Sequence, residues 1–389
     1  MIIKKWGLTA CVFLGCIVAA AGQTLPASKI TIEWDQSTLQ RLAPQDGRQL
    51  RYAGYPRVKR LGDGTAVAVY EAQGNTELIW SDDSGKTWSR PVITFRGHTH
   101  ADARGNEVQV NMANPEFIEL QNGDWLAACN YRPAKPEVAP FAIAIARSGD
   151  RGRTWSKPQV IFEAEPRFKD GCWEPAFLQL PDGTLQVYFA NEKPYITSDE
   201  QEISVLTSMD NGQSWTAEAR TVSFRAGRRD GMPVPLLVGD EILVAIEDNK
   251  VGQFKPYIVR TSIADNWKTP VGADSPMRGY ALRDSLPDEV YAGAPYLARL
   301  ATGEVLLAYQ TTKGRTTDWE KSTMEVAIGD KEGRNFRKIS RPFPAPPNRE
   351  AKWNAIALWD ESTVVATSAT NFDGGAINAW MILGRIVVD

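Results

Sequence analysis

Two glutamates occupy positions where a carboxylate could take part in acid–base chemistry. Glu174 stands between Trp173 and Pro175, where burial against the indole would raise its pKa and favour a proton donor. Glu247 directly follows the apolar stretch 242–246, which predicts a buried strand that ends at the carboxylate. Two carboxylates placed on either side of one bond are the minimum requirement for hydrolysis of a glycosidic bond.

Each glutamate also has a structural interpretation. Glu174 could accept hydrogen bonds from backbone N–H groups of a neighbouring structural unit. Glu247 could be an ordinary solvated strand end. Either interpretation explains one glutamate alone, whereas two carboxylates on one face of adjacent units favour a catalytic role.

Basic, amide and aromatic residues accompany the two glutamates at comparable positions of the chain. Arginines and amides suit sugar hydroxyl groups, and aromatic faces suit sugar rings. The predicted ligand is therefore an oligo- or polysaccharide. The residues expected to bind it are Arg57, Arg132, Trp173, Arg229, Tyr291, Tyr296, Gln310, Trp353 and Asn354.

Other chemistries lack the residues that they need. The two histidines, His98 and His100, fall outside these positions, so no serine or cysteine nucleophile with a histidine partner emerges. No cluster of cysteine, histidine and acidic residues completes a metal site, and the sequence has no glycine-rich phosphate loop. We therefore expect neither a metal ion nor a cofactor.

The elements that must position these side chains are a segment repeated six times. Each copy has an anchor residue, an apolar stretch, a polar turn that usually contains glycine, and a second apolar stretch, which together predict a β-hairpin. The anchors are Pro56, Pro115, Pro175, Pro233, Pro295 and Trp353, separated by 59, 60, 58, 62 and 58 residues. This spacing leaves room for a second hairpin in each copy. The pattern predicts an all-β fold, a six-bladed β-propeller of four-stranded antiparallel blades, with residues 23–389 as one catalytic domain.

The direction of the strands then predicts where the site lies. When strands alternate in direction, the start of the first strand and the end of the second lie at the same face of the propeller. The two glutamates and the predicted binding residues fall at or close to these two positions. The chemistry is therefore expected at this face, close to the axis.

An acidic motif recurs at the opposite face. Ser-x-Asp-x-Gly-x-Thr/Ser-Trp occurs over residues 81–88, 148–155 and 208–215, in the turn between the third and fourth strands. Its carboxylate can accept backbone N–H bonds across the turn while glycine takes the left-handed conformation. We therefore interpret Asp83, Asp150 and Asp210 as turn-forming residues and not as catalytic acids.

The N-terminal segment has the pattern of an export signal. Lys4 and Lys5 precede an apolar stretch over residues 6–20, and small residues follow it. We expect a signal peptide over residues 1–22 and a periplasmic or extracellular protein without stable membrane insertion; soluble export is favoured over lipid anchoring. Two cysteines follow the signal, Cys129 and Cys172. They could pair in an oxidising compartment, but two buried free thiols are the expectation. The net charge of −3 gives no reason to expect a nucleic-acid partner.

The segments around the two glutamates resemble a known family. Cys-Trp-Glu-Pro-Ala-Phe from Cys172, Arg-Asp-Gly-Met-Pro-Val from Arg229 and Ala-Ile-Glu ending at Glu247 are similar to glycoside hydrolase family 93. The acidic turn motif resembles the Asp box (BNR repeat) of the sialidase-type propellers. The resemblance implies a retaining exo-α-1,5-arabinanase that releases arabinobiose from arabinan. It also implies that Glu174 is the acid/base and Glu247 the nucleophile.

Two alternatives stay open. An exo-sialidase shares the fold and the Asp boxes, and resemblance to it would make Arg57 one of three arginines that clamp a substrate carboxylate. Arg132, Arg229 and Arg283 are candidates for the others, and Tyr291 or Tyr296 for the nucleophile. A non-catalytic glycan-binding propeller is the second alternative, but such a protein has no need of two converging carboxylates.

Overall fold

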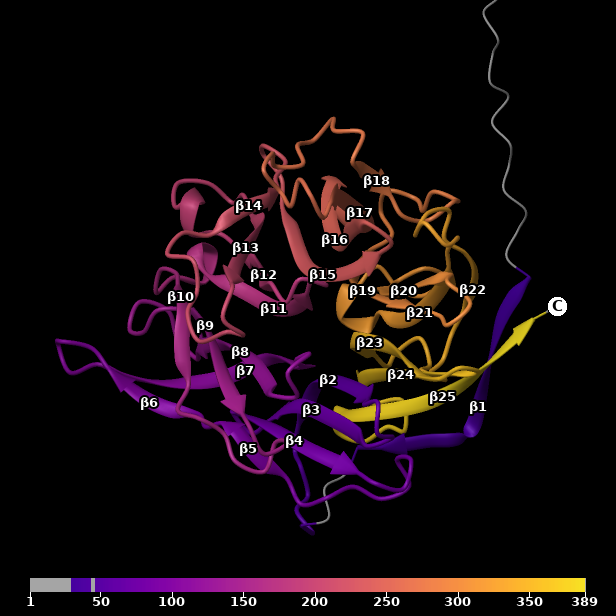
Figure 1. Ribbon diagram of the computed structural model, residues 1–389, viewed down its shortest axis with the longest axis horizontal. Coiled ribbons are helices and arrows are strands. Elements are labelled where there is room, and N and C mark those ends of the chain that lie inside the picture. The colour runs from indigo at the N-terminus through magenta and orange to yellow at the C-terminus, as the bar shows by residue number, and fades with distance from the viewer. Residues whose placement is uncertain (1–28, 43–45, 389) are drawn as a thin grey trace, which may run out of the picture.

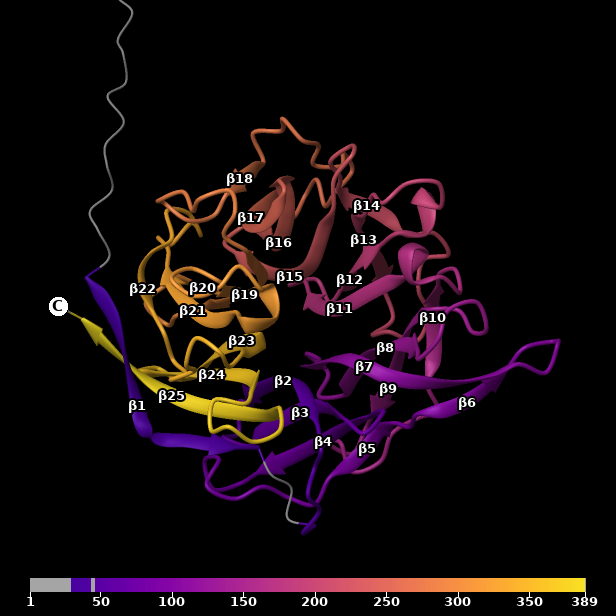
Figure 2. The same ribbon diagram turned by 180° about the vertical axis from the view of Figure 1, so that it is seen from behind.

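Six β-sheets surround a central axis in the computed structural model, which describes residues 29–42 and 46–388 (Figure 1). The signal peptide predicted over residues 1–22 lies outside the described residues. The view from behind shows the same closed ring (Figure 2). The predicted six-bladed propeller is therefore confirmed. Within the described ranges, no helix has the length and apolar character needed to cross a bilayer.

Each blade is an antiparallel sheet that runs from an innermost strand outwards. Blade 1 contains β2 Ala53–Arg60, β3 Ala66–Ala72, β4 Asn75–Ser81 and β5 Val92–Phe95. Blade 2 contains β7 Glu107–Glu119, β8 Trp125–Pro133, β9 Ala142–Ser148 and β10 Gln159–Glu163, with an additional strand β6 His98–Ala101 paired to the start of β7. Blade 3 contains β11 Cys172–Gln179, β12 Leu185–Asn191, β13 Glu202–Ser208 and β14 Arg220–Ser223.

The second half of the chain repeats this arrangement. Blade 4 contains β15 Asp230–Val238, β16 Glu241–Val251, β17 Gln253–Ser262 and β18 Arg278–Tyr280. Blade 5 contains β19 Ala292–Arg299, β20 Val305–Thr311, β21 Thr323–Ile328 and β22 Arg337–Ser340. Blade 6 contains β23 Ala351–Asp360, β24 Thr363–Thr370, β25 Asn378–Val388 and β1 Ile30–Arg41. Short 3₁₀ helices lie in loops at η1 Phe168–Asp170, η2 Lys193–Tyr195 and η3 Trp319–Lys321.

Blade 6 is built from both ends of the described chain. Strand β1 pairs antiparallel with β25, from Ile30 opposite Val388 to Arg41 opposite Trp380. The repeat in the sequence does not reveal this pairing, because β1 belongs to no complete copy of the repeat. The fourth strand of blade 6 therefore comes from the N-terminal side of blade 1, and it closes the ring.

Every innermost strand contains the same irregularity. The pairing register shifts in all six, and the residue at the shift has a positive φ of about 50°. These residues are Tyr55, Asn114, Glu174, Met232, Ala294 and Trp353. Proline follows in five of the blades and Asn354 follows in the sixth. The sixth anchor predicted from the sequence is therefore wrong by one residue: Asn354, and not Trp353, corresponds to the prolines.

The core lies between the blades. Apolar side chains of β12 and β13, among them Val187 and Val205, share one buried cluster with Ile242 and Val244 of β16. Cys129 and Cys172 are both buried and both free, as expected. The blades are therefore held by face-to-face packing of apolar side chains, and no bridge between these two thiols contributes.

The Asp boxes form turns, as interpreted from the sequence. Asp83 accepts the backbone N–H of Thr87 at 2.9 Å and the hydroxyl of Thr87 at 2.7 Å, and Asp150 and Asp210 make the equivalent bonds. These bonds, led by those from the hydroxyl groups, lower the pKa of all three carboxyls to about 2. Ser81 of the first box pairs with Ala66, at the end of β3 away from Glu71. Asp83 is therefore an ionised turn residue on the face opposite the predicted site.

Candidate functional site

Glu247 is held over a glycine of the neighbouring blade. It lies in β16 opposite Gly231, and its Oε2 accepts the backbone N–H of Ala294 in blade 5 at 2.8 Å. A Cβ atom on Gly293 would lie 2.3 Å from this oxygen, so only glycine leaves room for the carboxylate. The residue is 9% exposed, which rules out the solvated strand end considered above. Burial raises the pKa of Glu247 to about 7, against the opposing effects of the Ala294 N–H and the Arg229 charge.

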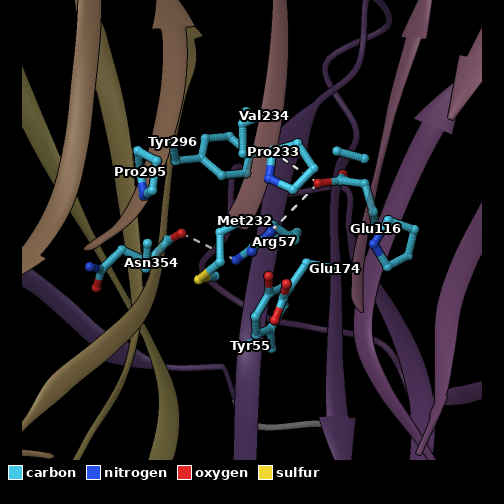
Figure 3. A pocket seen from close by; sticks show the side chains of 13 residues that line it. Tyr55, Arg57, Glu116, Glu174, Met232, Pro233, Val234, Pro295, Tyr296 and Asn354 are labelled. Atoms are coloured by element: carbon cyan, nitrogen blue, oxygen red, sulfur yellow. Dashed lines mark hydrogen bonds and ion pairs between the residues drawn. The ribbon is translucent and has the colours of Figure 1, made fainter. Parts of the chain in front are cut away.

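Glu174 lies in the irregular turn of β11 and lines a cavity on the axis (Figure 3). Among the described residues, its side chain has no hydrogen-bond or ion-pair partner. Burial, and then the charge of Glu247, raise the pKa of Glu174 to about 8. The structural alternative for Glu174 was a hydrogen bond from a backbone N–H of a neighbouring blade; in the described portion of the chain, Glu247 accepts such a bond, and Glu174 does not. The two carboxyls are close enough for the charge of one to affect the other.

The indole of Trp173 is fixed by a polar and an aromatic set of neighbours. Its Nε1 donates to Glu192 at 3.0 Å, and its ring packs against Phe141 and Phe168. The guanidinium of Arg132 lies over the Trp173 ring at 5.5 Å. Trp173 therefore lies between the buried acid Glu192 and the exposed Arg132.

Arg229 is neutralised by a buried acid. Its guanidinium forms an ion pair with Glu192, which is 1% exposed and also accepts the Trp173 indole N–H. Arg132, in contrast, is exposed and has no ion-pair partner among the described residues. Its charge acts on Glu174 and on Glu71. Arg132 is therefore more available to a ligand than Arg229.

A second group of predicted residues comes from blades 5 and 6. Gln310 donates to the hydroxyl of Tyr291 at 2.9 Å and accepts the backbone N–H of Trp353 at 2.8 Å. Trp319 contacts both aromatic rings, with centroids 6.1 Å from Tyr291 and 6.2 Å from Trp353. Trp319 is 42% exposed in the loop after β20, which ends at the predicted face. The sequence analysis did not predict Trp319, because it considered only residues at the ends of strands. A tryptophan within an otherwise polar loop could have indicated it.

Three further predicted residues lie deeper, around the axial cavity. Figure 3 shows Arg57 between Asn354 and Glu116, and Arg57 Nη1 donates to the backbone oxygens of Trp353 at 3.2 Å and Asn354 at 3.3 Å. Glu116 lies 3.6 Å from Arg57 Nε and accepts the hydroxyl of Tyr296 at 3.1 Å. Because blades 2 and 5 face each other, the Tyr296–Glu116 bond spans the axis. Arg57 and Tyr296 therefore tie the blades together around the cavity that Glu174 also lines.

The arrangement combines two interacting carboxyls with aromatic and amide groups from several blades. A carboxyl with a pKa of about 8 is protonated at neutral pH and can donate that proton. A carboxylate that accepts a backbone N–H is favoured in its ionised form. Among the described residues, no group of three histidine, cysteine or acidic side chains could hold a metal ion.

Comparison with known proteins agrees with this fold. Residues 135–238 match the family model of the BNR repeat-like domain, whereas comparison with curated proteins gives no match. An α-L-arabinofuranosidase from Fusarium graminearum, bound to an iminosugar inhibitor, is similar with a TM-score of 0.63 and 17% identity over 90% of this chain and 97% of that one.

Two further structures resemble the chain. An α-L-arabinanase from Penicillium chrysogenum with arabinobiose has a TM-score of 0.61 and 18% identity, over 90% of this chain and 98% of that one. A sialidase from Streptococcus pneumoniae has a TM-score of 0.61 and 13% identity, over 89% and 70%. The predicted resemblance to sialidase-type propellers, arabinanases among them, is thus confirmed at the level of the fold.

Proposed function

We propose that this protein is an exported retaining exo-glycoside hydrolase that releases arabinobiose from α-1,5-linked arabinan. The observation that carries the proposal is the pair of interacting carboxyls on adjacent blades, the partly exposed Glu174 on the axial cavity and the buried Glu247 over Gly293. The similarity to an arabinanase that holds arabinobiose supports the choice of substrate. The pattern of residues 1–22 supports export to the periplasm or beyond.

The environments of the two carboxyls support one assignment of roles. Glu174 has no hydrogen-bond donor in the part of the chain that the structure describes, and it has the higher pKa, about 8, so it holds the proton and passes it to the leaving-group oxygen as the glycosidic bond breaks. Glu247 accepts the N–H of Ala294, so it is the ionised group that attacks the anomeric carbon. Water then attacks the covalent glycosyl–Glu247 ester, and Glu174 takes the proton from that water.

A sialidase activity is the less favoured alternative. It needs three arginines available to bind a substrate carboxylate. Arg57 donates to backbone oxygens and lies beside Glu116, and Arg229 is paired with Glu192. Arg132 and Arg283 have no ion-pair partner among the described residues, which leaves two arginines where a sialidase needs three. The ionised carboxylate that the proposal assigns to Glu247 also disfavours an anionic sugar.

The test is a hydrolysis assay on linear arabinan, debranched arabinan and sialyl-lactose. Wild-type protein is compared with Glu174→Gln and Glu247→Gln, and folding is followed by circular dichroism. Arabinobiose from arabinan, lost in both variants, supports the proposal. Release of sialic acid, or arabinanase activity that survives either substitution, refutes it.

A further inference from the structure

A short sequence around the candidate site occurs twice in the chain. Tyr-Ala-Gly-Tyr-Pro starts at Tyr52 in blade 1, and Tyr-Ala-Gly-Ala-Pro starts at Tyr291 in blade 5. The two copies occupy the same position, because Gly54 and Gly293 each directly precede the residue with positive φ. In blade 5 the tyrosine lies beside the candidate nucleophile, since a Cβ on Gly293 would lie 2.5 Å from Tyr291 Oη and 2.3 Å from Glu247 Oε2.

In the blade 1 copy the tyrosine also lies beside a carboxyl group, here one from its own blade, at the position that Gln310 occupies in blade 5. Glu71 pairs with Gly54 in the sheet, and the hydroxyl of Tyr52 donates to Glu71 Oε1 at 2.7 Å. A Cβ on Gly54 would lie 2.1 Å from Tyr52 Oη and 2.8 Å from Glu71 Oε1. The backbone N–H of Asn114 in the next blade bonds to Glu71, as that of Ala294 bonds to Glu247. Both sites therefore require glycine, because a Cβ atom at that position would collide with the tyrosine hydroxyl and with the carboxyl group that lie over the backbone.

The Tyr52–Glu71 pair is more accessible than the tyrosine–glutamate pairs of the core. Tyr52 is 37% exposed and Glu71 is partly exposed. Tyr70 and Tyr309, which donate to Glu77 and Glu325, are both 0% exposed. In a further pair, Tyr195 is partly exposed but its partner Glu202 is buried, whereas both members of the Tyr52–Glu71 pair are accessible.

The position of the pair connects it to the two candidate catalytic carboxyls. The charge of Arg132 acts on Tyr52, Glu71 and Glu174, so all four groups surround the same region. Blades 1 and 4 lie on opposite sides of the ring, with β3 facing β16 across the axis (Figure 1). Glu71 therefore lies across the axis from Glu247, at the end of the corresponding strand.

We propose that Tyr52 and Glu71 bind hydroxyl groups of the sugar unit next to the one that reacts. A carboxylate can accept two neighbouring hydroxyls, and the phenol can accept or donate one more bond. This inference deepens the proposed function, on which it rests, by naming a subsite for a neutral sugar. Tyr52 and Glu71 act in binding and take no part in bond cleavage.

The test uses Tyr52→Phe and Glu71→Gln with two aryl glycosides, one carrying a single arabinofuranosyl unit and one carrying α-1,5-arabinobiose. Tyr70→Phe is the matched control, because it removes a tyrosine–glutamate bond from the core of the same blade. We expect both site variants to raise KM for the two-unit glycoside about 10-fold or more, since a hydrogen bond to a charged group contributes roughly 1.5–3 kcal/mol. KM for the one-unit glycoside and kcat for both are expected to stay within about twofold of wild type.

The outcomes separate this inference from the proposed function. An equal KM for the two-unit glycoside in wild type and Tyr52→Phe overturns the subsite, and so does a loss of kcat on the one-unit glycoside in Glu71→Gln. If wild type cleaves neither glycoside, the proposed function fails, and titration calorimetry with a panel of neutral disaccharides then tests the subsite. A disaccharide that binds wild type 10-fold more tightly than Tyr52→Phe supports it. Equal binding of every disaccharide overturns it.

Discussion

The close approach of Gly293 to Glu247 makes the position of the candidate nucleophile testable with a single methyl group. In Gly293→Ala the new Cβ would lie 2.3 Å from Glu247 Oε2, whereas ordinary contacts begin at 3.4 Å. Because Gly293 does not have a positive φ, the substitution strains no backbone angle. The same Cβ would lie 2.5 Å from Tyr291 Oη, so both side chains must move, and the carboxylate must retreat by about 1 Å, away from the N–H of Ala294.

The expected effect follows from that displacement. A shift of about 1 Å in a reacting group costs on the order of 100-fold in rate, and we expect kcat on arabinan to fall by about this factor. Loss of the N–H donor also raises the pKa of Glu247 further above its present value of about 7. The carboxylate then ionises only at higher pH, so the acidic limb of the kcat/KM profile should move upwards.

The assay measures kcat/KM between pH 5 and 10 for wild type, Gly293→Ala and Gly279→Ala. Gly279 is the matched control, because it also lies in a strand, has no positive φ, and has open space where a Cβ would be. Thermal unfolding shows that all variants are folded. Activity of Gly293→Ala within threefold of Gly279→Ala would refute the geometric reasoning.

Three further predictions follow from the same site. Because Glu247 must be ionised and Glu174 protonated, kcat/KM of wild type should fall below pH of about 7 and above about 8; an optimum near pH 4.5 on a neutral glycoside would contradict these assignments. The raised pKa of Glu174 means that its contribution to stability is present below pH of about 4.5 and is lost as pH rises through about 8, so Glu174→Gln should raise Tm relative to wild type at pH 9 by about 2 °C or more and leave it unchanged at pH 4. Tyr296→Phe removes the bond across the axis to Glu116 and should lower the free energy of unfolding in urea by about 1–3 kcal/mol with KM unchanged, whereas a raised KM with unchanged stability would show that Tyr296 contacts the substrate.

Much of the fold could be predicted from the sequence because the propeller repeats its local chemistry. Glycine turns and apolar strands recur at nearly constant spacing, so the number of blades and the strand order follow from counting. The same regularity identified Asp83 and its equivalents as turn residues, since a catalytic acid has no reason to recur three times. Strand direction alone then brought Glu174 and Glu247 to one face.

The details that the sequence did not reveal depend on contacts between distant segments. Arg229 pairs with Glu192, which lies in the preceding blade, and this choice of partner is set by burial and not by a motif. The offset of Trp353 arose because the sixth copy lacks the proline that marks the others. Trp319 reaches the site from a loop whose course no periodic pattern describes. The Arg229 and Trp319 contacts concern how side chains of distant segments meet, which repetition of strands does not determine, and the Trp353 offset concerns the register of one copy.

The pairing of β1 with β25 has a consequence for how the protein acquires its shape. These strands are separated by more than 330 residues, so the last contact of the ring has a very large sequence separation and must form late and slowly. Until β25 is available, β1 has no partner and the outer edge of β24 is also unpaired, and both edges can capture strands of other chains. Any chain interrupted before residue 378 would keep these edges open. Pairing of the two ends therefore requires the complete ring, because only a chain that extends through β25 can cover these two edges and close the propeller that carries the two glutamates.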